Sequence, residues 1–117
     1  MSLKQILKTL VDLGLSNIDA EVYIFLATKA PQNAKDIANA LKMRNQQLYP
    51  SLRNLQNKGI INCTSERPKL FSAVPIEEAL SSFINASLEE AQQMEENKKK
   101  ILSFWQAMIK ENRQHRE

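Results

Sequence analysis

Apolar residues recur at helical spacing from the first residues of the chain. One stretch runs from Leu3 to Val11, and Gly14 follows it as a residue suited to a left-handed helix stop. A second, largely apolar stretch begins after Ser16, which is a suitable N-cap, and continues to Ala30-Pro31. The pattern therefore predicts two helices, the second of them mostly buried.

Two further helices are predicted between residues 33 and 58. Asn33 is a suitable N-cap for a short helix that ends near Lys42-Met43. After a turn at Arg44, a leucine stripe at positions i, i+4 and i+7 indicates a helix over about residues 45–58 that buries one face, and Gly59 ends it. The stripe is Leu48, Leu52 and Leu55, and the side expected to face solvent is Gln46, Gln47, Pro50, Arg53, Asn54 and Asn57.

The period then changes from helical to alternating. Residues 60–64 and 70–74 are two short runs that favour β-strands, and Ser65-Glu66-Arg67-Pro68 between them is typical of a turn. This order, with a short capped helix, a tight turn, an amide-rich helix and a hairpin, predicts a mainly α fold with a small β-hairpin wing, the winged helix-turn-helix. We expect this domain to span residues 1–75.

Charge is unevenly divided between the two parts of the chain. Up to Pro75 there are ten basic and five acidic residues, and beyond it six basic and eight acidic ones. A basic first part indicates a polyanionic partner, and the second part must have a different role. The chain has one cysteine, no cationic apolar leader and no run of 18 apolar residues, so we expect a cytoplasmic protein without a membrane partner.

Four segments resemble one protein family. They are LGLSNIDAEVYIFL at 13–26, AKDIANAL at 34–41, LYPSLRNLQNKGII at 48–61 and PKLFSAVPIEEAL at 68–80. Together they are similar to the DNA-binding domain of TrmB-type archaeal transcriptional regulators. The resemblance implies a winged-helix fold, double-stranded DNA as partner, a usually dimeric state and a role in transcription. Larger family members carry a C-terminal sugar-binding domain; this chain stops after one more helix, so effector sensing is not carried over and any small-molecule effector stays unknown.

Within this fold, the helix at 45–58 would enter the major groove with its N-terminal residues nearest the bases. Amides can pair with adenine, arginine suits guanine or phosphate, and wing cations reach phosphates or the minor groove. A family tyrosine matches Tyr49, which either bonds a phosphate or packs. The candidate DNA-binding residues are Lys35, Arg44, Asn45, Gln46, Gln47, Tyr49, Arg53, Arg67 and Lys69.

Pro50 conflicts with a regular helix over this stretch. With Asn45 as N-cap, Pro50 would be the fifth helical position, where it removes a backbone hydrogen bond. Either the regular helix starts nearer Tyr49, or its first turn is bent. The family commonly has a polar residue here.

Residues 76–117 are predicted to form one long helix, since neither proline nor glycine interrupts the pattern. Its heptads contain Ser87, Lys98 and Asn112, so a strict parallel coiled coil is poorly supported. Large apolar side chains nevertheless need a cover, which indicates a homodimer rather than a helix folded back on its own domain. In such a homodimer, this helix would pack against its copy or against the first helix of the partner. The expected dimer interface is Leu88, Ile101, Phe104, Trp105 and Met108.

Catalysis and metal binding find little support. The single histidine, His115, lies near the chain end, and Cys63 has no ligand spacing around it. Glycine-rich phosphate loops and nucleophile elbows are missing from the sequence, so no catalytic residue, metal or cofactor is expected. The alternative function is a winged-helix protein–protein assembly module without specific DNA binding. A DNA-binding protein needs its cations on one face, whereas an assembly module does not.

Overall fold

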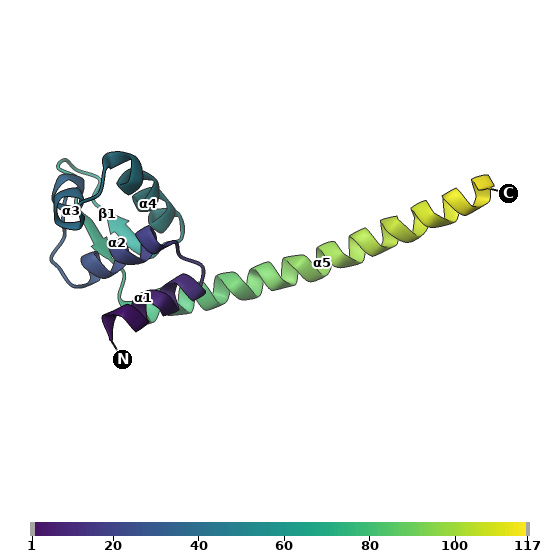
Figure 1. Cartoon of the computed structure of the whole chain (residues 1–117), viewed down its shortest axis with the longest axis horizontal. Coiled ribbons are helices and arrows are strands. Elements are labelled where there is room, and N and C mark those ends of the chain that lie inside the picture. The colour runs from purple at the N-terminus through teal and green to yellow at the C-terminus, as the bar shows by residue number, and fades with distance from the viewer. Residues whose placement is uncertain (1, 117) are drawn as a thin grey trace. The chain divides into compact units, whose positions relative to one another are not determined.

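The computed structural model describes the backbone of residues 2–116 and the side chains of residues 2–113. In chain order, the elements are α1 (Leu3–Asp12), α2 (Asn17–Ala27), α3 (Ala34–Leu41), α4 (Asn45–Asn57), β1 (Ile61–Cys63), β2 (Phe71–Ala73) and α5 (Ile76–Arg116) (Figure 1). This is the predicted mainly α class with a β-hairpin and a long C-terminal helix. The chain divides into two compact units, Met1–Phe83 and Ile84–Glu117.

Local capping sets the helix boundaries of the first unit. Ser16 Oγ accepts a hydrogen bond from the Asp19 amide at 3.0 Å, and Asn33 Oδ1 accepts one from the Asp36 amide at 2.8 Å. Both bonds satisfy an amide that has no partner inside its own helix, which is why these residues begin α2 and α3 as predicted. Gly14 has φ 115°, a left-handed value that suits glycine, and it turns the chain away after the end of α1.

The hairpin has the predicted position, with shorter strands. β1 and β2 are antiparallel, and Asn62 pairs with Ser72 at the centre of the register. The regular ladder stops at Thr64 because its side-chain hydroxyl accepts from the Leu70 amide at 2.9 Å, while the Thr64 amide donates to the Leu70 carbonyl at 3.0 Å. The side-chain bond closes the loop where a further strand pair would have formed.

A third segment that was not predicted pairs with the hairpin. Gln32, just before α3, exchanges two backbone hydrogen bonds with Phe71, of 3.0 and 2.8 Å. One residue is too short to give an alternating pattern, so the sequence carries no strand signal here. The bridge ties the start of α3 to the wing.

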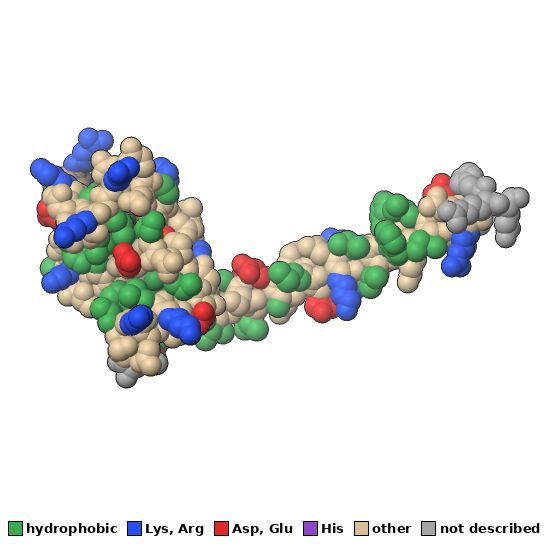
Figure 2. All heavy atoms as spheres, in the orientation of Figure 1, with side chains coloured by type: hydrophobic (Ala, Val, Ile, Leu, Met, Phe, Trp, Pro, Cys, Tyr) green, Lys and Arg blue, Asp and Glu red, His purple; other side chains and the backbone are tan. Residues whose placement is uncertain are grey.

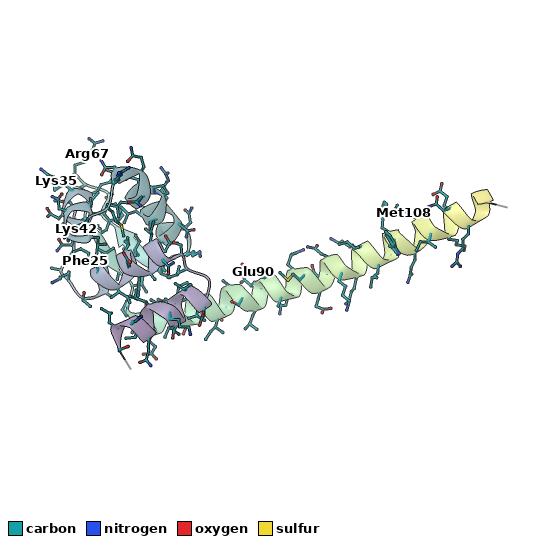
Figure 3. The ribbon with its side chains drawn as sticks, viewed as in Figure 1. Phe25, Lys35, Lys42, Arg67, Glu90 and Met108 are labelled. Carbon is teal, nitrogen blue, oxygen red and sulfur yellow. The ribbon has the colours of Figure 1, made fainter. Side chains whose placement is uncertain are left out.

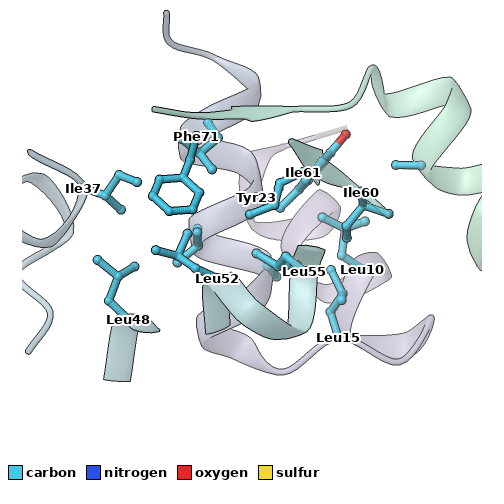
Figure 4. Close-up of a cluster of buried hydrophobic side chains, with 14 of the residues drawn as sticks. Leu10, Leu15, Tyr23, Ile37, Leu48, Leu52, Leu55, Ile60, Ile61 and Phe71 are labelled. Atoms are coloured by element: carbon cyan, nitrogen blue, oxygen red, sulfur yellow. The ribbon is translucent and has the colours of Figure 1, made fainter. Parts of the chain in front are cut away.

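The core of the first unit lies between the helices and the hairpin (Figure 4). Its largest fully buried side chains are Tyr23, Leu10, Ile37, Leu48, Leu52, Leu55, Ile60 and Val22. Tyr23 donates its hydroxyl to the Val74 carbonyl at 2.6 Å, so the one polar atom of this side chain has a partner. Desolvation by burial raises the pKa of Tyr23 above its ordinary value of 10.0.

The beginning of α5 belongs to this core. Ala79 is fully buried and Phe83 is 6% exposed, and both are part of the same apolar cluster. The first compact unit therefore extends past residue 75, where the sequence placed the end of the winged helix. From Ile84 to Arg113, every side chain is exposed.

Candidate nucleic-acid interface

The turn between α3 and α4 gives the helix-turn-helix its geometry. α3 ends at Leu41, and Lys42 follows in the left-handed region with φ 54°. The Met43 amide donates to the Ala38 carbonyl at 3.0 Å, and this bond closes the end of α3. The chain thus turns within three residues and starts α4 after Arg44.

α4 presents one polar face outward. Leu48, Leu52 and Leu55 are buried as predicted, so at 100° per residue the opposite face of the helix is Gln46, Pro50, Arg53 and Asn57, which are all exposed. Gln46 and Arg53 lie about two turns apart on this face. Asn57 continues it but was not among the candidate site residues.

Gln47 has a role that the sequence did not indicate. Its Oε1 accepts from the Arg44 amide at 3.2 Å, which places the side chain back over the start of α4. An arginine side chain has no acceptor atom and cannot cap the helix itself, so Gln47 satisfies the amide at this end. The N-cap is therefore Arg44, and the placement of the N-cap at Asn45 was wrong.

Pro50 lies inside the helix. Because α4 begins at Asn45, Pro50 is its sixth residue, and the alternative in which the regular helix starts near Tyr49 is wrong. Proline has no amide hydrogen, so the bond that residue 50 would donate to the Gln46 carbonyl does not form. Pro50 is exposed, and the leucine stripe beside it keeps its packing.

Asn54 was predicted to face solvent, but its side chain is half-buried and turned toward α2. Its Nδ2 donates to Asp19 Oδ2 at 2.6 Å, and Ser51 Oγ donates to Asp19 Oδ1 at 2.6 Å. Asp19 and Ser51 are 5% and 4% exposed. The sequence showed Asp19 only as an acid in the first turn of α2, since no local pattern reveals a partner more than thirty residues away. This carboxylate fixes α4 on α2, the helix beneath it.

Cationic and amide side chains meet where α3 gives way to α4. An open hollow at this junction is lined by Lys35, Ala38, Asn39, Met43, Arg44, Asn45 and Tyr49. Four predicted site residues thus share one surface. Asn39 joins them although the sequence reading missed it; it lies one helical turn after Lys35, and that spacing was the available signal.

Arg67 and Lys69 lie in the loop of the wing. Both side chains are exposed, on either side of Pro68. Lys35, Lys42 and Arg67 project from the same side of the first unit in the view of Figure 3. Figure 2 shows further Lys and Arg side chains on this face of the unit, with few acidic ones among them.

In the part of the chain that the structure describes, no three His, Cys, Asp or Glu side chains are grouped as a metal site would need. No helix among these residues combines the length and apolar character that a membrane crossing requires. His115 lies outside the described side chains.

The family of the chain follows from residues 10–77, which match the model of the sugar-specific transcriptional regulator TrmB. The chain belongs to the TrmB family. Its members are described as transcriptional regulators, in agreement with the resemblance seen in the sequence. No curated protein matched the chain.

Solved structures similar to this TrmB family member are winged-helix proteins. TrmBL2, an archaeal chromatin protein, is 23% identical with a TM-score of 0.74 over 86% of this chain and 39% of its own. MepR, a regulator of a Staphylococcus aureus multidrug efflux pump, is 22% identical with a TM-score of 0.53 over 86% and 87%. The MarR family regulator SP03579 is 14% identical with a TM-score of 0.56 over 95% and 78%. These likenesses confirm the fold, and the chain spans about two fifths of the length of TrmBL2.

Proposed function

We propose that this TrmB family member is a sequence-specific double-stranded DNA-binding transcriptional regulator. The helix at about 45–58 would lie in the major groove, and the wing at 60–74 would contact the DNA backbone or the minor groove. Membership of a family of transcriptional regulators supports the general role. The details rest on the surface chemistry of the first unit.

The hollow at the α3–α4 junction carries this proposal. Lys35 and Arg44 supply positive charge there, and Asn45 and Tyr49 supply neutral hydrogen-bonding groups beside them. Cations that neutralise phosphates next to amides that can pair with base edges are the combination a major-groove reader requires. A protein-binding face has no need of this combination.

The candidate readers have different freedom to contact bases. Gln46 is exposed on the outward face of α4, and Arg53 follows on the same face. Gln47 Oε1 is already bonded to the Arg44 amide, so only its NH₂ group is free of that bond. We therefore assign base contacts first to Asn45 and Gln46, phosphate or guanine contact to Arg53, and helix capping to Gln47. Arg67 and Lys69 would supply phosphate contacts from the wing.

A homodimer through α5 completes the proposal. The five expected interface side chains are all exposed: Leu88, Ile101, Phe104, Trp105 and Met108. An exposed apolar series of this size on a water-soluble helix is typical of an interface. A regulator of this kind would act in the cytoplasm, where its DNA is.

The test begins with selection of bound duplexes from random DNA by the full-length protein. Gln46→Ala should lower discrimination at one or two base pairs of the selected site by on the order of 1 to 3 kcal/mol and leave non-specific binding unchanged, because an amide releases no counterions. Gln47→Ala is the matched control at the neighbouring position. It should lower the free energy of unfolding by about 0.5 to 1 kcal/mol through the lost cap, with a smaller effect on base preference.

Two outcomes would contradict this function. Failure to enrich any sequence, together with weak binding at low salt, would favour the assembly module. A selected site whose preferences are the same for wild type, Gln46→Ala and Asn45→Ala would show that the polar face of α4 is only solvated.

A further inference from the structure

The exposed part of α5 has an apolar seam with an internal symmetry. Because Ile84–Arg113 is continuous helix, residues that alternate in steps of four and three share one stripe along it. That stripe is Ile84, Leu88, Ala91, Glu95, Lys98, Leu102, Trp105 and Ile109. It reads as three apolar residues, an acid, a base and three apolar residues, and its steps are the same from either end.

The symmetry has a defined centre between Glu96 and Asn97. Turning a second copy end to end about this point places Ile84 opposite Ile109, Leu88 opposite Trp105, Ala91 opposite Leu102 and Glu95 opposite Lys98. In heptad terms, each pair joins an a position to a d position. This is the pairing that an antiparallel coiled coil makes, whereas a parallel one pairs a with a and d with d.

We propose that α5 pairs with the α5 of a second copy in an antiparallel coiled coil centred between residues 96 and 97. The proposal rests on the homodimer proposed above and adds its direction and register. The occupant of the exposed apolar stripe is then a second copy of this chain. Figure 2 shows apolar side chains along this helix.

Charge at the centre of the stripe decides the direction. In a parallel pair, Glu95 would face Glu95 and Lys98 would face Lys98 within the seam, so both layers would be repulsive. In the antiparallel pair, the same residues make two attractive Glu95–Lys98 contacts. Charge along the rest of the helix favours the same direction. Residues 76–96 include six glutamates and no basic residue, and Lys98, Lys99 and Lys100 come after them, so an antiparallel pair sets the acidic part of one copy against the lysines of the other.

Side-chain volume favours the same direction. The antiparallel pair sets the small Ala91 against Leu102 and the large Trp105 against Leu88, so each of them meets a leucine and these layers differ less in volume than in a parallel pair. A parallel pair would oppose two alanines in one layer and two tryptophans in another, which leaves a gap and a crowded site. The antiparallel direction therefore accommodates both the small Ala91 and the large Trp105.

The flanks of the stripe account for further exposed residues. Met94, Ile101 and Met108 lie one position before Glu95, Leu102 and Ile109, on one flank of the stripe. In the antiparallel register, Met94 of one copy lies beside Ile101 of the other, and these side chains are 68% and 65% exposed in the single chain. Phe104 is outside both the stripe and this flank.

Charge reversal tests the direction in the full-length protein. Lys98→Glu should raise the dimer dissociation constant by on the order of tenfold, because both central contacts become repulsive. Glu95→Lys combined with Lys98→Glu restores two opposite-charge contacts and should return the constant to within about threefold of wild type. The control is Lys100→Glu, a reversal on the outward face, which should leave it unchanged. Sedimentation equilibrium measures the dimer dissociation constants of wild type and the three variants.

Spin-label distances test the register directly, on a Cys63→Ser background that removes the single native thiol. A label at Ala86 lies outward on α5 and would be about 32 Å from its copy along an antiparallel pair, at 1.5 Å per residue. A label at Asn97, beside the centre, would be only about 2 Å from its copy along the same axis. A parallel pair would give similar distances at both sites.

Each result has one meaning. A long distance at residue 86, a short one at residue 97 and rescue by the double charge reversal support the proposal. Similar distances at both labels, or a Lys98→Glu variant that dimerises as tightly as wild type, overturn the antiparallel register while leaving the dimer standing. A wild-type protein that is monomeric at all concentrations overturns both the register and the homodimer, and DNA selection then tests the regulator function independently.

Discussion

Asp19 should contribute more to stability than its place in the first turn of a helix would suggest. Its two carboxylate oxygens accept hydrogen bonds of 2.6 Å from Ser51 Oγ and Asn54 Nδ2, and the residue is 5% exposed. Short bonds to a charged acceptor contribute about 1.5 to 3 kcal/mol each, less the cost of burying the charge. Asp19→Ala would leave the buried Ser51 hydroxyl without this acceptor, whereas the half-buried Asn54 could turn toward water.

We expect Asp19→Ala to lower the free energy of unfolding by about 3 kcal/mol, mainly from the orphaned serine hydroxyl and the lost charged bonds. Asp36→Ala is a matched control, because Asp36 occupies the same third position of its helix beneath an N-cap but is exposed. Losing its interaction with the helix dipole should cost about 0.5 kcal/mol. Urea unfolding monitored by circular dichroism measures both.

A double-mutant cycle separates the bond from the general cost of the substitution. If Ser51 and Asp19 interact as the 2.6 Å contact indicates, Ser51→Ala should cost less in the Asp19→Ala background, with a coupling of about 1 to 2 kcal/mol. Equal losses for Asp19→Ala and Asp36→Ala, or a coupling near zero, would refute the view that this carboxylate anchors α4.

Four further predictions concern other parts of the chain. Burial raises the pKa of Tyr23, so above about pH 10 the unfolded chain binds fewer protons than the folded one, and the free energy of unfolding should fall with rising pH. Tyr23→Phe should lower the free energy of unfolding by about 1 kcal/mol at pH 8 and make its fall at higher pH less steep, as measured by urea titrations. Pro50→Ala should restore one helical hydrogen bond and stabilise the fold by about 1 to 2 kcal/mol, seen as a higher melting temperature, and an unchanged or lower value would show that the proline fits its site without cost. Arg67→Ala should weaken binding to all duplexes alike and reduce the salt dependence by about one phosphate contact in titrations at several salt concentrations, whereas loss of preference at one base pair would make Arg67 a reader. Ile101→Glu with Trp105→Glu should give a monomer by ultracentrifugation while the winged helix keeps its circular dichroism; a persisting dimer would place the interface elsewhere.

Most of the fold could be predicted because its signals are local. Ser16 and Asn33 start helices through bonds to amides three residues away, and Gly14 ends one through its own backbone conformation. The leucine stripe of α4 needs only the helical period to identify its buried face. Where a side chain acts within one turn of its own position, the sequence contains the whole interaction.

The candidate site could be predicted only in part, because its residues come together through contacts that are not local in the sequence. Lys35, Arg44, Asn45 and Tyr49 were named from the sequence, but only the turn at Lys42 brings them into one hollow, and it adds Asn39 to them. Gln47 looked equivalent to Gln46 because both are amides at adjacent positions. The start of α4 at Asn45 separates them, since it gives Gln47 an amide to cap and leaves Gln46 facing outward.

Contacts between residues distant in sequence were decided by the tertiary structure alone. The sequence around Asp19 does not indicate that its carboxylate bonds to Ser51 and Asn54. The sequence around Gln32 does not indicate a bridge to Phe71. Such pairs form because the packing of apolar faces brings their elements together first, and the polar groups left inside must then find partners among whatever is nearby. The sequence determines where each helix begins and which face it buries; which buried polar groups meet depends on how those faces pack.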